Sequence, residues 1–289
     1  MNIWDEIKES FKEGSALTRL IYINLGLFLI IRITNVFYFL AGTPFPFLDW
    51  LALPADFSKL ASRPWTLVTY MFLHFDFLHI LFNLLWLYWF GQIFLQYLSH
   101  KQLLGLYILG GIAGALLYSL AYNLFPAFNL ERFGSTMVGA SAAIMAIVIA
   151  IAAIAPNYTL NLLLLGPVKL KYIAIFTIII DAISIQNSNA GGHIAHLGGA
   201  FMGYIFAVQY KKGKDITSGL NKLLDFLSAL FKRKPKMKVS YKKPSDDKEY
   251  NKIKIDQQKE IDRILDKIAK GGYNSLSKEE KDFLFRSSK

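Results

Sequence analysis

Four polar side chains lie within apolar stretches of this sequence, at positions where they could carry out chemistry together. Ser141 follows Gly139 in the run VGASAA, and His196 lies in the run GGHIAHLGG. His79 and Asn83 are four residues apart, a spacing that puts both on one face of a helix. A serine hydroxyl becomes an effective nucleophile when a neighbouring base accepts its proton, and a neutral imidazole can do this near neutral pH. The four residues therefore predict acyl transfer, with Ser141 as nucleophile and His196 as base.

Acyl transfer also needs hydrogen-bond donors for the oxyanion that develops on the substrate carbonyl. We expect the side-chain amide of Asn83, an N–H of His79 and the backbone N–H of Ser141 to supply them. Taken singly, each residue also has an ordinary interpretation. A serine in a membrane helix commonly bonds to a carbonyl one turn earlier, and His79 with Asn83 could simply hold helices together.

Six apolar segments are long enough to place these residues in a membrane, since a spanning helix needs about 20 mostly apolar residues. They cover residues 18–40, 76–98, 102–124, 138–155, 168–186 and 193–210. The predicted fold class is therefore an all-α membrane protein with six transmembrane helices. The N-terminal segment, 1–17, is acidic and amphipathic, so we expect the first apolar run to stay in the membrane and not to be cleaved as a signal peptide.

A long connection, residues 41–75, separates the first two predicted spans. It is too polar to cross the membrane, but it is rich in aromatic side chains and contains four prolines. Tryptophan and tyrosine favour the membrane–water interface because their rings are partly apolar and partly polar. We therefore expect an interfacial structure at the level of the headgroups.

Charged residues in the short loops predict the orientation of the spans. With six spans, both termini and the loops near residues 101 and 156–171 share one face, which carries most of the Lys and Arg residues. An excess of positive charge marks the cytoplasmic side, so both termini are expected there. The second, fourth and sixth spans then all begin at the outer side. The four polar residues lie within about the first two turns of those spans and are predicted to share one depth.

Small residues accompany the candidate site on the same spans. Gly199 and Gly203 have the GxxxG spacing in the sixth span, and Gly139 precedes the serine of the fourth. Small residues allow membrane helices to pack backbone to backbone. We expect this packing to bring Ser141 and His196 within hydrogen-bond reach.

Charge is distributed unevenly along the 289 residues. Residues 1–210 carry 10 Lys/Arg and 9 Asp/Glu, whereas residues 211–289 carry 22 Lys/Arg and 12 Asp/Glu. The basic C-terminal part is expected to be soluble and attracted to anionic lipid headgroups. Nucleic-acid binding is disfavoured, because no basic fold with interleaved aromatic residues accompanies the charge. The sequence contains no cysteine, which excludes disulfides, thiolate metal sites and a cysteine nucleophile.

The C-terminal part divides into two regions. Residues 211–250 form a basic amphipathic segment, with a surface helix over 211–231 followed by a charged linker that contains prolines. Residues 251–289 regain helical periodicity and are predicted to form a small cytoplasmic helical hairpin. Ser277 and Glu280 have the spacing of a capping box for its second helix.

The remaining histidines favour structural interpretations. His74 and His193 lie nearer the outer rim, where ordinary surface or loop hydrogen bonding is favoured. A metal site built from these two with His79 and His196 is disfavoured, because no HExxH helix accompanies them and Asp76 is the one carboxylate in the cluster. No cofactor or metal is therefore expected.

Two further ionisable residues fall within predicted spans, Arg32 in the first and Asp181 in the fifth. Charged groups in the hydrocarbon region are costly and are therefore candidates for function. Neither residue aligns with the serine and histidine motifs. We expect both to be structural, either paired with each other or reaching a water-accessible edge.

The combined pattern resembles the rhomboid family of intramembrane serine proteases over residues 15–210. The resemblance rests on the HxxxN of His79 and Asn83, the GxS of Gly139 and Ser141, and the AHxxGxxxG run of Ala195, His196, Gly199 and Gly203. It implies a six-helix rhomboid protease domain over 18–210, a Ser–His dyad without an acidic third member, and an oxyanion site at His79 and Asn83. It also implies that the substrates are transmembrane helices that enter sideways.

Two of the departures from the family pattern lie close to the candidate serine. Ala142 stands where a glycine usually follows the serine, and Met145 stands where an aromatic residue often packs on the histidine. The C-terminal stretch ILDKIAKGGYNSLSKEEKDFLF resembles the tail of rhomboids from Bacteroidota, which implies a bacterial cytoplasmic membrane as the location. The alternative to a protease is a non-catalytic rhomboid-like protein that binds or chaperones membrane clients. A transporter is disfavoured, because the polar residues gather at one leaflet.

Overall fold

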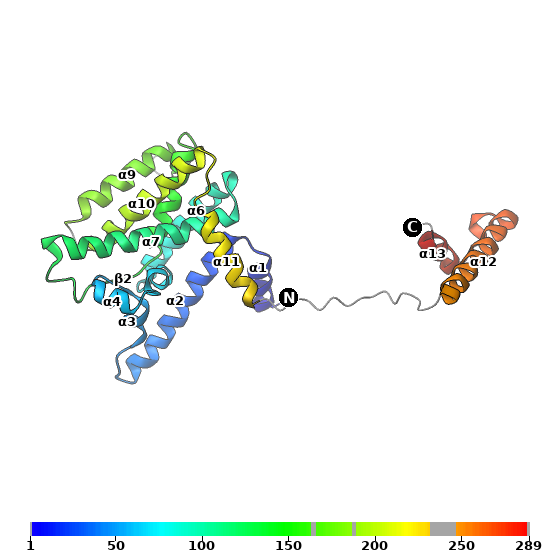
Figure 1. Ribbon diagram of the computed structural model, residues 1–289, viewed down its shortest axis with the longest axis horizontal. Helices are drawn as coiled ribbons and strands as arrows, with labels where there is room; N and C mark the ends of the chain where they lie inside the picture. Colours follow the sequence, from blue (N-terminus) through cyan, green and yellow to red (C-terminus); the bar gives the residue numbers. More distant parts are fainter. Residues whose placement is uncertain (1, 163–165, 187–188, 232–246, 288–289) are drawn as a thin grey trace. The chain divides into compact units, whose positions relative to one another are not determined.

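The computed structural model describes residues 2–162, 166–186, 189–231 and 247–287 (Figure 1). The chain divides into two compact units, Met1–Phe231 and Lys232–Lys289, which are described separately. The linker predicted in the second half of 211–250 lies mostly outside the described residues.

The first unit is built mainly of helices. The longer helices are α1 (Ile3–Glu13), α2 (Ala16–Leu40), α6 (Phe77–Tyr97), α7 (His100–Leu124), α8 (Ser141–Ile154), α9 (Leu170–Ser184), α10 (Ala190–Lys211) and α11 (Ser218–Phe231). Each of the six predicted spans corresponds to one helix, α2 and α6 to α10, so the all-α class is confirmed. Within the described residues, α2, α6 and α7 are long and apolar enough to cross a membrane, and α8 is a shorter apolar helix. The count of six spans stays a prediction.

The connection between α2 and α6 folds against the segment that leads into α8. It contains α3 (Phe47–Leu51), β1 (Leu53–Pro54), α4 (Phe57–Ser62), α5 (Thr66–Thr69) and the 3-10 helix η1 (Tyr70–Phe72). Strand β1 pairs antiparallel with β2 (Thr136–Met137), with Leu53 opposite Met137. The N–H of Gly139 donates to the Tyr70 carbonyl at 2.9 Å. The predicted interfacial loop therefore fixes the backbone two residues before Ser141.

Aromatic and cationic side chains stabilise this connection. The rings of Trp50 and Trp65 stack at 6.0 Å, and the Arg63 guanidinium lies 5.0 Å from the Trp50 ring. The indole N–H of Trp65 donates to the Trp50 carbonyl at 2.8 Å. Both tryptophans keep about half of their surface exposed. This suits a layer that is in contact with headgroups, although that placement remains a prediction.

Helix α8 lies at the centre of the first unit, between α7 and α10. Residues Ala142 to Ala152 are all buried. The methyl group of Ala142 faces Gly114 of α7, because a Cβ on Gly114 would lie 2.6 Å from it. The departure from glycine at position 142 therefore fills space between helices. A second antiparallel pair, β3 (Thr159–Leu162) and β4 (Gly166–Lys169), connects α8 to α9.

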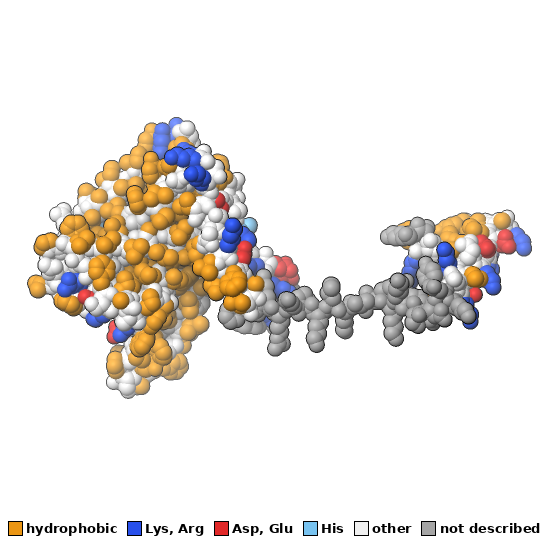
Figure 2. Space-filling model, in the orientation of Figure 1, with side chains coloured by type: hydrophobic (Ala, Val, Ile, Leu, Met, Phe, Trp, Pro, Cys, Tyr) orange, Lys and Arg blue, Asp and Glu red, His pale blue; other side chains and the backbone are white. Residues whose placement is uncertain are grey.

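The outer surface of the first unit is largely hydrophobic (Figure 2). Large apolar side chains are exposed along the outward faces of α2 and α9: Ile30, Ile33, Phe37, Phe39, Leu40, Ile175, Phe176, Ile179 and Ile183. Soluble monomers rarely expose apolar patches of this extent. The surface has the composition expected of helices that face lipid.

Helix α11 forms over the segment where a surface helix is predicted. At its start, Thr217 and Asn221 are buried against Gly105 of α7, and Lys101 forms an ion pair with Asp225 at 2.6 Å. Its exposed apolar side chains are Leu223, Phe226, Leu227 and Leu230. These side chains would suit a membrane surface, and that contact stays a prediction.

The second unit contains α12 (Asp247–Gly271), the 3-10 helix η3 (Tyr273–Ser275) and α13 (Lys278–Ser287). The predicted capping box is confirmed: the Ser277 N–H donates to Glu280 at 2.8 Å, and the Glu280 N–H donates to the Ser277 hydroxyl at 3.3 Å. The carboxylate of Glu280 also accepts from Arg263 and Lys267 of α12. Glu280 therefore connects the two helices of this unit.

We expect the second unit to lose stability as the pH falls below the ordinary glutamate range. The Lys267 ammonium, the Ser277 N–H and the Arg263 guanidinium lower the pKa of Glu280 from 4.5 to about 2. Its contribution is therefore complete above pH 4.5 and is lost progressively as the pH falls from there through about 2. Protection factors for hydrogen exchange of α12 and α13 in the full chain, which correct for the intrinsic pH dependence of exchange, should fall over this range in the wild type and much less in Glu280→Gln, which should already be less protected at neutral pH. If hydrogen exchange of α12 and α13 depended on pH identically in the wild type and in Glu280→Gln, this stabilising role of Glu280 would be contradicted.

Candidate functional site

Ser141 is the first residue of α8, and Gly139 controls how the chain reaches it. Gly139 has a φ of +126°, a conformation that side chains other than glycine rarely adopt. A Cβ at this position would also lie 2.8 Å from Cε1 of His79. Glycine is therefore required both for the turn and for the approach of His79. As the first residue of a helix, Ser141 has a backbone N–H without an intrahelical partner, so this N–H is available as a donor.

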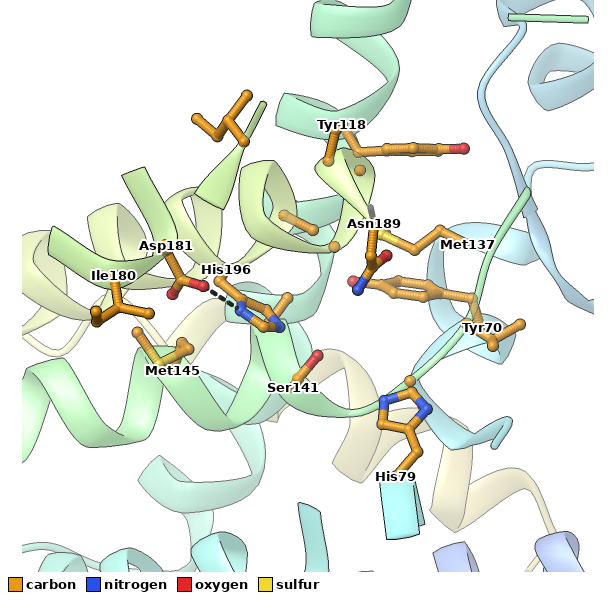
Figure 3. Close-up of a pocket in the computed structure, with 18 of the residues that line it drawn as sticks. Tyr70, His79, Tyr118, Met137, Ser141, Met145, Ile180, Asp181, Asn189 and His196 are labelled. Atoms are coloured by element: carbon orange, nitrogen blue, oxygen red, sulfur yellow. Dashed lines mark hydrogen bonds and ion pairs between the residues drawn. The ribbon is translucent and has the colours of Figure 1, made fainter. Parts of the chain in front are cut away.

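His79 and Asn83 lie one turn apart at the start of α6. One amide N–H of Asn83 donates to the His79 carbonyl at 2.8 Å, the amide has a second N–H, and the residue lines the cavity. The backbone of α6 therefore holds Asn83 in a fixed orientation. The imidazole of His79 lies close to Gly139, and Figure 3 shows it near the Ser141 side chain.

His74 lies against Ala140, the residue before Ser141, and is fully buried, so the expectation of a position on the rim is wrong. Its Nε2 accepts from the Ala140 N–H at 3.4 Å, and its ring lies 5.1 Å from that of His79. Burial, with a smaller contribution from His79, lowers the pKa of His74 to about 3. His74 is therefore neutral near pH 7 and acts as an acceptor that supports the residue before Ser141.

His196 comes from the first half of α10, which packs closely on α8. A Cβ on Gly199 would overlap the carbonyl oxygen of Ala142, and one on Gly203 would overlap that of Ala146. This close packing sets His196 opposite the start of α8. In Figure 3 the Ser141 side chain lies near the edge of the His196 ring that faces away from Asp181.

Asp181 on α9 provides an acidic partner that the sequence interpretation missed. Its Oδ1 lies 2.8 Å from Nδ1 of His196 and 2.8 Å from Nδ1 of His193. The expectation of a serine–histidine pair without an acidic neighbour is therefore wrong. Of the two arrangements left open for Asp181 and Arg32, the structure does not show their pairing: Asp181 contacts the two histidines, and Arg32 is exposed on α2.

A signal for this contact was present in the sequence. Asp181 is an ionisable residue in an apolar span, which by itself marks a candidate functional residue. The predicted fifth span runs toward the outer side, so its C-terminal half has the depth of the N-terminal half of the sixth span. This topology brings residue 181 to the level of His193 and His196.

These side chains surround one open cavity of about 1510 Å³. Its lining includes all four residues singled out from the sequence, Ser141, His196, His79 and Asn83, together with Asp181. Aromatic side chains complete the wall, among them Tyr70, Trp86 and Phe128. The cavity is large enough to admit an extended peptide segment together with water.

The described residues offer one group with metal-ligand geometry, namely Asp181, His193 and His196, whose ligand atoms lie within 4.8 Å of one another. The two histidine contacts have the length of ordinary hydrogen bonds. The carboxylate of Asp181 is therefore hydrogen-bonded to both rings. The four histidines of the disfavoured metal site form two separate ring contacts, His74 with His79 and His193 with His196.

Two family models match parts of the chain. Residues 61–212 match the model of the Rhomboid domain, and residues 245–289 match a family of unknown function, DUF6576. RHOMBOID-like protein 12, mitochondrial, from Arabidopsis thaliana is 28% identical over 221 residues, which cover 73% of this chain and 63% of that protein. The chain thus spans less than two thirds of the length of that relative.

Proposed function

The chain belongs to the rhomboid family and is an integral membrane protein, and on this premise we propose that it is an intramembrane serine endopeptidase. The observation that carries the proposal is the convergence of Ser141 and His196 on one cavity (Figure 3). The Ser141 hydroxyl attacks the substrate carbonyl while His196 accepts its proton. The imidazolium then protonates the leaving amine, and water activated by His196 hydrolyses the acyl-enzyme.

The oxyanion of this reaction forms near the start of α8. The backbone N–H of Ser141, the second amide N–H of Asn83 and an N–H of His79 are the donors that we assign to it. The Asn83 amide is already held by its bond to the His79 carbonyl, so little reorganisation is needed as charge develops.

The proposed substrates are transmembrane proteins that are cut near a helix end. The apolar outer surface of the first unit (Figure 2) supports this proposal, because a substrate helix would reach the cavity from the lipid. We further propose that both termini are cytoplasmic, as the loop charges indicate, and that the protein lies in a bacterial cytoplasmic membrane.

The test is cleavage of a panel of model transmembrane substrates in reconstituted membranes by the wild type, Ser141→Ala and His196→Ala. We expect both variants to lose cleavage, because each removes one member of the reacting pair. Ser119→Ala is the matched control, since Ser119 is buried on α7 outside the cavity lining. Equal cleavage by Ser141→Ala and the wild type would exclude the assignment.

Labelling by a serine-directed fluorophosphonate separates two reasons for an absence of cleavage. Labelling of the wild type but not of Ser141→Ala would show a competent nucleophile whose substrate is missing from the panel. Binding of the substrates without labelling or cleavage would favour the non-catalytic, client-binding alternative.

A further inference from the structure

We propose that Asp181 is a positioning residue that orients His196 and fixes its tautomer, so that the site works as a Ser141–His196–Asp181 triad. This inference rests on the proposed function for its kinetic consequence. Its structural part, the tautomer of His196, is independent of catalysis.

The geometry of the three residues carries the inference. Asp181 Oδ1 lies 2.8 Å from His196 Nδ1, a distance typical of a hydrogen bond that involves a charged group. The Asp181 side chain is 9% exposed and that of His196 is 22% exposed, so the contact is largely shielded from water. Figure 3 shows the carboxylate and the Ser141 hydroxyl on opposite edges of the same imidazole.

A carboxylate at Nδ1 determines which ring nitrogen carries the proton of the neutral histidine. An ionised carboxylate only accepts hydrogen bonds, so Nδ1 must be the protonated nitrogen. Nε2 is then left with a lone pair on the side of the Ser141 hydroxyl, as a general base requires. The same carboxylate stabilises the imidazolium that forms when His196 takes the serine proton.

A purely structural role for Asp181 makes different predictions. His193 Nδ1 lies at the same 2.8 Å from Oδ1, so the carboxylate also ties α9 to α10 through a residue that lies one turn before His196. If holding the two helices together were its main role, loss of the His193 contact and loss of the His196 contact would have similar effects. Each would then lower stability and activity by about the same amount as the other. The triad predicts that loss of the contact with His196 lowers activity far more than loss of the contact with His193.

The kinetic test compares Asp181→Asn with His193→Gln, using substrate cleavage in reconstituted membranes. Asparagine keeps the shape of the side chain but removes the charge and can stabilise the wrong tautomer. The equivalent change in serine proteases with a buried triad lowers kcat by about 10⁴-fold. Because His196 is partly exposed, we expect a smaller loss, about 10²-fold in kcat, with KM within about threefold. His193→Gln should lose no more than about threefold.

The spectroscopic test does not depend on activity or on a variant of Asp181. Nitrogen NMR of full-length, histidine-labelled protein in nanodiscs at about pH 8, above the ordinary histidine pKa, reports which ring nitrogen is protonated. His196→Gln identifies the His196 signals among those of the five histidines. We expect the Nδ1–H form of His196 in the wild type and its depletion in Asp181→Asn.

The outcomes separate the triad from the proposed function. An Nε2–H tautomer of His196 in the wild type would overturn the triad, whatever the activity. Equal losses of kcat in Asp181→Asn and His193→Gln, accompanied by equal falls in thermal unfolding temperature, would assign Asp181 to helix packing instead. The wild type could also show the Nδ1–H tautomer but neither cleave substrates nor react with the fluorophosphonate. That result would support the positioning role of Asp181 and contradict only the protease assignment.

Discussion

Gly199→Ala is expected to lower kcat by about 10²-fold or more and to reduce the thermal unfolding temperature. The added methyl group would overlap the carbonyl oxygen of Ala142, which is backbone and cannot rotate away. Helix α10 must therefore move outward relative to α8, and His196 moves with it. Overpacking of this kind costs typically 1–3 kcal/mol of stability, and a shift of about 1 Å between reacting groups can cost about 10²-fold in rate. Cleavage kinetics and thermal unfolding in the same detergent measure the two effects.

The matched control for this change is Gly26→Ala on α2. Gly26 is also a glycine within a membrane helix, but a Cβ there has no heavy atom within 4 Å. We expect Gly26→Ala to retain activity and to gain slightly in stability, because alanine is the better helix former. Similar behaviour of the two variants would mean that α8 and α10 are packed more loosely than the structure shows.

Much of the helical framework follows from the sequence because hydropathy and small-residue spacing are local signals. The six apolar segments coincide with helices α2 and α6 to α10 to within a few residues. The GxxxG spacing of Gly199 and Gly203 corresponds to the two places where α10 meets carbonyl oxygens of α8. The motif spacing also singled out the four residues that the structure places around one cavity.

Features that depend on how the helices are rotated against one another could not be predicted from local sequence patterns. The direction of the Ala142 methyl group, toward Gly114 and between helices, depends on the rotation of α8 against α7. The pairing of β1 with β2 involves two residues in each strand, too few to leave a periodic pattern. The contact of Asp181 with two histidines depends on which side of α9 faces α10, although its depth was implied by the topology.

Asn83 is the donor whose proposed role in catalysis can be separated most directly from a role in packing. Its amide bonds to the carbonyl one turn earlier, and Asn24 of α2 makes the same contact with the Leu20 carbonyl, also at 2.8 Å. The two asparagines are both buried, but Asn83 lines the cavity and Asn24 does not. Asn24 is therefore a control for the loss of a buried amide that donates to the carbonyl one turn earlier.

Asn83→Ala is expected to lower kcat by about 10²- to 10³-fold while KM changes by no more than about threefold. Loss of one oxyanion donor has this magnitude in other serine hydrolases, because the interaction strengthens as the charge develops. Asn24→Ala should reduce the thermal unfolding temperature, since the Tyr107 hydroxyl 3.3 Å away loses a partner, but it should leave kcat within about threefold. Steady-state cleavage with both variants separates these effects. A rise in KM at constant kcat for Asn83→Ala would assign its amide to substrate binding, because an interaction equally strong in ground and transition states cannot accelerate the chemical step.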